Sequence, residues 1–86
     1  MACLHLLFHH SALESCLESR NSGDAILLIQ DGAYAALTDQ TTTFLALEDD
    51  IDSRGLTDKL GPNVTRISHR DMVQQVCTHQ PIVSWR

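Results

Sequence analysis

Residues 25–32 read Ala-Ile-Leu-Leu-Ile-Gln-Asp-Gly, an apolar run followed by a polar turn. A continuous apolar run of this length is typical of a strand that is buried on both faces, as in parallel sheets covered by helices on either side. Turn-forming residues at 21–24 precede the run, and the turn at 30–32 ends it. This segment therefore predicts a central strand of an α/β sheet.

The segments around this strand alternate between short apolar runs and stretches with helical periodicity. Further strands are expected at residues 3–8, 43–47, 64–67 and 82–85. Helices are expected at residues 12–20, 33–37, 48–54 and 69–79, with a looser turn from 55 to 60. Alternation at this spacing predicts right-handed βαβ crossovers and a mostly parallel sheet.

Four residues are placed to begin or end these helices. Ser11 and Ser68 are each followed three residues later by an acidic residue, the form of a capping box. Asp31 stands where it would cap the short helix at 33–37, and Gly55 stands where a glycine terminates a helix. We expect one three-layer α/β domain over residues 1–86, flavodoxin-like, with roughly four or five strands. Functional residues are expected outside the carboxyl ends of the strands.

Chain length and charge restrict the classes of function. For 86 residues, area scaling predicts a folded surface of about 5,100 Å² and burial of about 63% of the unfolded surface. Such a small core often relies on a partner subunit, so an oligomer is expected. The net charge of -5 disfavours a surface that grips nucleic-acid phosphates.

The cysteines and the amino-terminal residues indicate the compartment. Cys3, Cys16 and Cys77 are odd in number and irregularly spaced, which favours reduced thiols over a disulfide framework. The apolar run at 2–8 lacks the basic start and the cleavage site of a signal peptide. No stretch has the ~20 apolar residues of a membrane span. We expect a cytoplasmic chain.

Motifs for nucleotide, zinc and dithiol chemistry are missing from the sequence in their usual local forms. The acidic run at 48–50 is interpreted as the solvated first turn of a helix. Cys77 and His79 have poor spacing for a shared metal, and the weakest hypothesis is a metal site of Cys3, His5 and a neighbouring histidine. We therefore predict no metal and no cofactor.

Cys16 is the cysteine with two open interpretations. It lies on an apolar stripe with Leu13 and Leu17, where a free cysteine behaves as a small hydrophobe. Arg20, four residues on, would face the thiol and favour its reactive thiolate form. Cys3 and Cys77 are both interpreted as structural, Cys77 on a stripe with its neighbouring valines.

Two sequence blocks carry a resemblance to a known family. Residues 23–36 read GDAILLIQDGAYAA, and residues 45–56 contain the pattern ALExDxxxRGL. Together with the opening run and the terminal Trp85, they resemble the TusB/DsrH family over nearly the whole chain. Within this resemblance, Asp31, Gly32, Tyr34 and Trp85 are family motif residues expected at the strand carboxyl edge or at an interface. Asp31 and Gly32 also fit a turn that ends the strand, and Tyr34 and Trp85 fit the core equally well.

The resemblance implies a subunit of a sulfur relay complex. Such a subunit assembles with TusC/DsrF-like and TusD/DsrE-like homologues into a hexamer of two heterotrimers. The complex receives persulfide sulfur through a small carrier protein of TusE/DsrC type. It passes the sulfur toward 2-thiolation of the tRNA wobble uridine or, in the Dsr system, serves sulfur oxidation; we expect the tRNA route as the more widespread.

The resemblance also implies how chemistry is divided among the subunits. The principal sulfur-accepting cysteine belongs to the TusD/DsrE-like subunit, so this chain is expected to have no independent catalysis. Cys16 matches the cysteine-bearing first helix of DsrH members, which makes it a candidate auxiliary persulfide carrier. An alternative of another class is a homo-oligomeric flavodoxin-like module that binds a small ligand.

Overall fold

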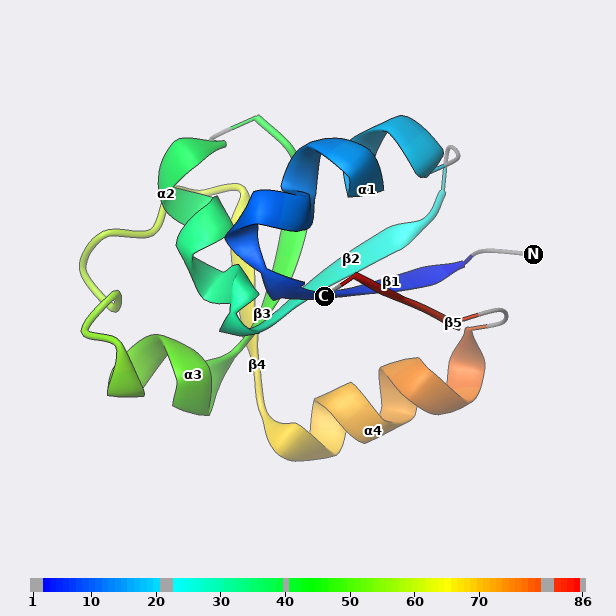
Figure 1. Ribbon diagram of the computed structural model, residues 1–86. Helices are drawn as coiled ribbons and strands as arrows, with labels where there is room; N and C mark the ends of the chain where they lie inside the picture. Colours follow the sequence, from blue (N-terminus) through cyan, green and yellow to red (C-terminus); the bar gives the residue numbers. More distant parts are fainter. Residues whose placement is uncertain (1–2, 21–22, 40, 80–81, 86) are drawn as a thin grey trace.

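The computed structural model describes residues 3–20, 23–39, 41–79 and 82–85. Its five-stranded sheet has the order β4-β3-β2-β1-β5, and every neighbouring pair is parallel (Figure 1). The strands are β1 (Leu4–His9), β2 (Ala25–Asp31), β3 (Phe44–Leu47), β4 (Val64–Ile67) and β5 (Ile82–Trp85). The helices are α1 (Leu13–Ser19), α2 (Ala35–Thr38), α3 (Glu48–Ser53) and α4 (His69–Thr78). Short 3₁₀ turns, η1 (His10–Ala12) and η2 (Gly32–Tyr34), precede α1 and α2.

This arrangement confirms the expected α/β sheet. The predicted strands are all present to within two residues, and β2, with its continuous apolar run, is the middle strand of the sheet. The chain exposes 5052 Å², close to the area that scaling predicts. In the part of the chain that the structure describes, no helix has the length and apolar character needed to cross a bilayer.

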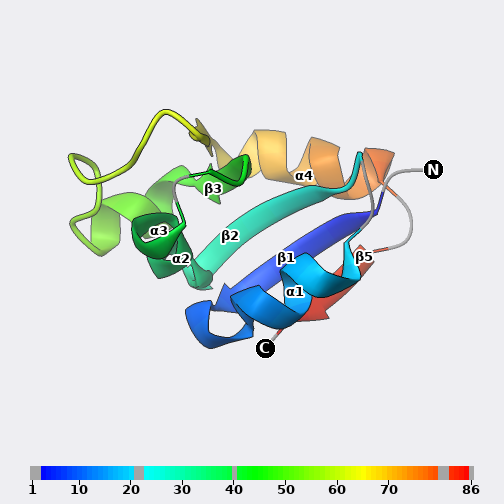
Figure 2. The same ribbon diagram turned by 90° about the horizontal axis from the view of Figure 1, so that it is seen from above.

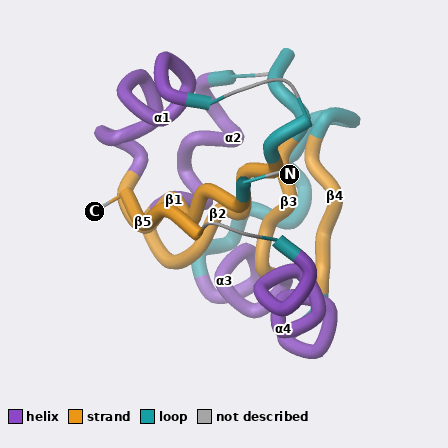
Figure 3. Tube along the Cα trace, turned by 90° about the vertical axis from the view of Figure 1, so that its right-hand side faces the viewer, coloured by secondary structure: helices purple, strands orange, loops and turns teal. Residues whose placement is uncertain are grey.

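The two faces of the sheet are covered unequally. Helices α1 and α2 lie on one face and α4 on the other (Figures 1 and 3). Seen from above in Figure 2, α4 runs along one side of the sheet and α1 along the other. The α1 side holds the larger core cluster, including Leu7, Leu28 and Phe44. The α4 side holds a small cluster around Leu27, with Met72 of α4 packed against it.

Two of the predicted caps are wrong. Ser11 does not cap α1, because it lies inside η1: the helix starts after Ala12 without a side-chain capping bond, and the Ser11 hydroxyl instead contacts His9 Nδ1 at 2.8 Å. Asp31 makes no capping bond either. The other two predictions are confirmed, since the Ser68 side chain accepts from the first turn of α4 and Gly55 follows α3 with a φ of 64°.

Asp39 organises the turn that leads into β3. Its carboxylate accepts hydrogen bonds from the Thr42 hydroxyl at 2.6 Å and from the Thr41 and Thr42 backbone N–H groups at 2.9 and 3.0 Å. These bonds, above all the one from the Thr42 side chain, lower the pKa of Asp39 from 3.8 to about 2. Because the folded pKa lies below the unfolded value, the stabilisation is present above pH 3.8 and disappears as the pH falls through about 2.

We therefore expect Asp39→Asn to lower the free energy of unfolding at pH 7 by about 1 to 2 kcal/mol. The difference from the parent chain should shrink steadily below pH 4 and be lost near pH 2, where Asp39 is itself protonated. Urea unfolding followed by circular dichroism across this pH range measures it. Asp58→Asn removes the same charge from an exposed residue and should show no such trend.

Candidate functional site

Cys16 lies on the face of α1 that packs against the sheet, and none of its surface is exposed. It belongs to the larger core cluster, beside residues such as Leu7. Burial raises the pKa of the Cys16 thiol to about 11, with Arg20 opposing the shift and Cys3 and Asp24 adding to it. At neutral pH the thiol is therefore a neutral core group. Chemistry at Cys16 requires α1 to move away from the sheet.

The other two cysteines have different surroundings. Cys77 was predicted to be structural on an apolar stripe of α4, but it is exposed. The stripe itself is open, since Val73 is 55% exposed and Val76 is 36% exposed. The helical spacing was recognised correctly, but this chain supplies nothing that covers the stripe among the residues described. Cys3 is half-buried at the start of β1.

The two sequence blocks of the family resemblance meet at the carboxyl edge of the sheet. Gln30 has a φ of 53°, in the left-handed region, and its backbone N–H donates to the Asp50 carboxylate at 2.7 Å. Arg54 donates to Asp31 from Nε and Nη2 at 3.2 and 3.1 Å, and its Nη1 lies 3.5 Å from Asp50. Asp31 thus acts as a partner for Arg54, which ties the end of β2 to α3.

Gly32 is required at this edge because of a close backbone approach. A Cβ atom at this position would lie 1.8 Å from the Leu7 carbonyl oxygen. The glycine therefore lets η2 cross directly over the end of β1. The sequence places Gly32 in the turn that ends β2, and the structure shows that the turn needs the space a side chain would fill.

The predicted interface aromatics make contacts within the chain. Tyr34 is half-buried against the larger core cluster, and its ring meets the His10 ring edge-on with centroids 6.2 Å apart. Trp85 packs against the same cluster from β5, and its indole Nε1 donates to His5 Nδ1 at 3.0 Å. These contacts give both residues a structural role, and an interface role for them stays a prediction.

The acidic run at the start of α3 is engaged in surface ion pairs. Arg66 lies 3.3 Å from Glu48 and 3.0 Å from Asp52, and His69 lies 3.4 Å from Asp49. These side chains are 34% to 79% exposed, so each pair contributes little to stability. The placement matches the predicted first helical turn.

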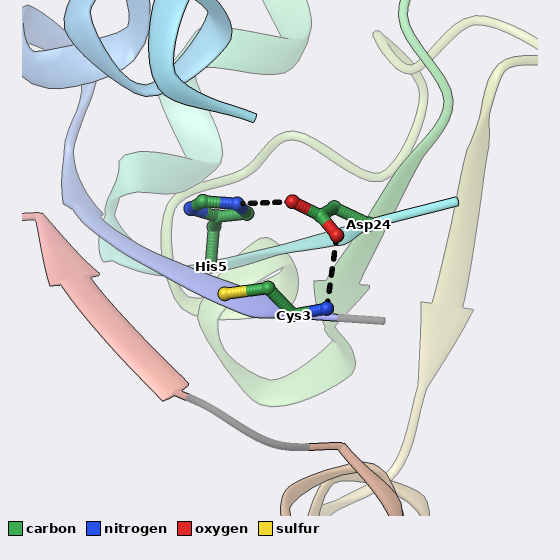
Figure 4. A group of neighbouring side chains, drawn as sticks. All are labelled: Cys3, His5 and Asp24. Atoms are coloured by element: carbon green, nitrogen blue, oxygen red, sulfur yellow. Dashed lines mark hydrogen bonds and ion pairs between the residues drawn. The ribbon is translucent and has the colours of Figure 1, made fainter. Parts of the chain in front are cut away.

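The sequence predicts only two of the three members of a polar group at the opposite, amino-terminal edge of the sheet. Cys3, His5 and Asp24 come together there (Figure 4). The Asp24 carboxylate accepts from the Cys3 backbone N–H at 2.9 Å and lies 3.0 Å from His5 Nε2. The sequence interpreted Asp24 as a turn former only. Asp24 stands directly before an apolar strand that runs parallel to the strand with His5. This position is the sequence signal that indicates its place beside His5.

A groove runs along the α4 face of the sheet, with a volume of about 380 Å³. Its floor is formed by sheet residues and its wall by α4, and the apolar lining residues are Leu6, Phe8, Ile29, Leu47, Met72 and Val76. Ile82 of β5 pairs with Leu4, faces the same side and is 39% exposed. This face therefore presents apolar surface that the chain itself leaves partly open.

Comparison with known proteins places the chain in a family. It matches the family described as DsrH like protein over residues 7–82. Protein TusB of Enterobacter sp. (strain 638) is 34% identical, over 95% of this chain and 99% of its own length. Protein TusB of Pectobacterium atrosepticum is 31% identical over 90% of each chain, and that of Yersinia pestis is 35% identical over 90% of each. The chain therefore belongs to the TusB/DsrH family.

Proposed function

We propose that this chain is a TusB-type subunit of a sulfur relay complex that passes persulfide sulfur toward 2-thiolation of the tRNA wobble uridine. The observation that carries the proposal is the family match over residues 7–82, together with relatives named Protein TusB that align over most of both chains. The complex would be a cytoplasmic heterohexamer with TusC/DsrF-like and TusD/DsrE-like subunits and a TusE/DsrC-type sulfur carrier.

The geometry supports a docking role without independent catalysis. Cys16 is buried with a raised pKa, and Arg54 ties the carboxyl edge to neighbouring carboxylates. Neither arrangement provides an activated, accessible nucleophile. The principal sulfur acceptor would belong to the TusD/DsrE-like subunit. The net charge of -5 also disfavours direct contact of this subunit with tRNA.

The α4 face is the surface we assign to a sister subunit. Its groove is lined mainly by apolar side chains, with Gln30, Asp50 and His69 as the polar lining residues. Val73 and Ile82 add further exposed apolar side chains. Apolar surface of this kind marks protein interfaces more often than free solvent-facing surface. A partner that covers it would also complete the smaller core, which in this chain centres on Leu4, Leu27 and Ile67.

A matched pair of substitutions tests this surface. Val76→Asp places a charge in the groove and should weaken association with the sister subunits at least about tenfold, because the carboxylate would be buried without a partner. Leu37→Asp is the control: Leu37 is 37% exposed, against 36% for Val76, but it lies on α2, on the other face of the sheet. Isothermal titration of each variant with the purified sister subunits measures the affinity. Equal effects of the two variants would contradict the assignment.

The function itself is tested in cells and in complexes. A strain that lacks this chain should lose 2-thiouridine from hydrolysed tRNA and recover it when the parent gene is restored. Unchanged thiolation together with lost sulfur oxidation would instead identify the Dsr-type role. Size-exclusion chromatography with and without the sister subunits separates both from the ligand-binding alternative, in which the chain stays homo-oligomeric and ignores them.

Cys16 as an auxiliary persulfide carrier is a separate proposal within this function. The match of its helix with that of DsrH members supports it, whereas the full burial of Cys16 means that α1 has to open before a donor sulfur reaches the thiol. Incubation of the assembled complex with a persulfide donor should then add one sulfur to Cys16 and none to Cys3 or Cys77. An unmodified Cys16 in the complex would end the carrier proposal.

A further inference from the structure

Three metal-ligand types converge at the amino-terminal edge of the sheet, under α1 (Figure 4). The Cys3 sulfur, a His5 ring nitrogen and an Asp24 carboxylate oxygen all lie within 4.8 Å of one another. The His5 and Asp24 side chains are 3% and 4% exposed. A buried imidazole beside a buried carboxylate, with a thiol within reach, is an unusual grouping for a chain with an apolar core.

The hydrogen bonds of His5 assign its protonation. Trp85 Nε1 lies 3.0 Å from His5 Nδ1, and an indole N–H is able only to donate. Nδ1 therefore carries no proton, and the proton of this neutral imidazole is on Nε2, from which it is donated to Asp24 Oδ2 at 3.0 Å. The chain of bonds runs from Trp85 through His5 to Asp24 and joins β5 to the start of β2.

We propose that Cys3 Sγ, His5 Nε2 and the Asp24 carboxylate form a binding site for a divalent metal ion of the zinc type. A thiolate, an imidazole and a carboxylate together suit a borderline-soft ion such as Zn²⁺. Tetrahedral bonds of about 2.0 to 2.3 Å place ligand atoms about 3.3 to 3.6 Å apart. The separation of His5 Nε2 from Asp24 Oδ2 is already 3.0 Å, and water takes the fourth position. The proposal is independent of the sulfur relay function.

Access to the site is available from solvent. A cavity of about 360 Å³ adjoins Asp24 between the starts of β2 and β3, with Arg20 and Thr42 among the residues on its walls. Cys3 is only half-buried. An ion can therefore reach the carboxylate and the thiol while the larger core stays closed.

Metal binding redistributes two protons. The ion takes the Nε2 position of His5, so the imidazole proton moves to Nδ1. The Cys3 thiol gives its proton to water and binds as thiolate, and one thiolate plus one carboxylate balance the two positive charges. Nδ1–H then faces the Trp85 N–H, donor against donor, and that hydrogen bond is lost. Metal occupancy and the Trp85 hydrogen bond are therefore mutually exclusive.

The experiment uses the chain without an affinity tag, with Co²⁺ as a spectroscopic probe under reducing conditions. We expect a thiolate-to-cobalt charge-transfer band and a change in the fluorescence of Trp85, the only tryptophan of the chain, both saturating at one equivalent and reversed by Zn²⁺. Cys3→Ser should remove the band and weaken metal binding at least about tenfold. A tenfold loss of affinity is the smallest effect usual for removing even a residue that only hydrogen-bonds to a metal ligand. This variant keeps the backbone bond from residue 3 to Asp24, so folding is retained.

Two controls make the outcome decisive. Cys77→Ser changes an exposed cysteine on α4 that is not a member of the group and should leave both signals intact. The double variant His9→Gln, His10→Gln removes two adjacent histidines outside the group, whose rings stack with centroids 4.7 Å apart. It should also leave both signals unchanged. The proposal would be overturned if the parent chain bound no Co²⁺ or if the charge-transfer band survived in Cys3→Ser. Loss of the band in the His9→Gln, His10→Gln variant would overturn it as well.

Discussion

Gly32→Ala is expected to destabilise this chain strongly. The added Cβ would lie 1.8 Å from the Leu7 oxygen and 2.7 Å from its carbonyl carbon, and both are backbone atoms of β1 that have no free rotation. Either the β1 to β2 pairing or the path of η2 would have to shift. We expect a loss of about 3 kcal/mol or more. For 86 residues the whole free energy of unfolding is roughly 4 to 13 kcal/mol.

Urea unfolding and soluble yield measure this effect, with Gly55→Ala as the matched control. Gly55 has a φ of 64°, and a Cβ there would meet nothing within 4 Å. Its replacement introduces backbone strain without a steric clash, which costs about 1 kcal/mol. The pair therefore separates lack of space from lack of conformational freedom. A Gly32→Ala variant no less stable than Gly55→Ala would show that the close approach to Leu7 relaxes easily.

Alkylation of Cys16 is expected to be at least about 100-fold slower in the folded chain than in urea. Its pKa rises from 9.0 to about 11, and two pKa units reduce the thiolate fraction about 100-fold at neutral pH. Its zero exposed surface slows the reaction further. Peptide mapping after timed iodoacetamide treatment gives the rate for each cysteine separately.

Cys77 provides the internal standard, because it is exposed in the folded chain and should react at a similar rate in both conditions. A folded-state rate at Cys16 within about tenfold of the rate in urea would mean that α1 opens readily. The same measurement in the assembled complex is informative for sulfur transfer. Faster alkylation there would indicate that partner subunits expose Cys16, as a carrier role requires.

Most of the fold follows from local patterns in the chain. The run at 25–29 is apolar at every position, which requires cover on both faces, and the helix periods between strands supply that cover. Ser68 and Gly55 mark helix ends because capping depends on groups within one turn. Ser11 failed as a cap because it lies inside the η1 turn, and the N-cap position of α1 falls on Ala12 instead.

The sequence predicts a functional residue only where its role depends on neighbouring positions in the chain. Cys16 was recognised on its stripe, but spacing along one helix does not say whether another element covers that face. Here the sheet does so for Cys16, whereas Cys77 on α4 stays exposed. The role of Arg54 as partner of Asp31 also lay beyond the sequence, because the two residues belong to different elements and 23 positions separate them.

The sequence by itself determined the class of fold, the order of strands and helices along the chain and the family, because each of these depends on patterns within short segments. The tertiary structure alone decided which side chains meet: His5 with Trp85, 80 positions apart, His5 with Asp24 at the sheet edge, and Gly32 against Leu7. It also decided which apolar stripe is left open. Strand order in the sheet, which places β1 between β2 and β5, is the physical reason for these meetings.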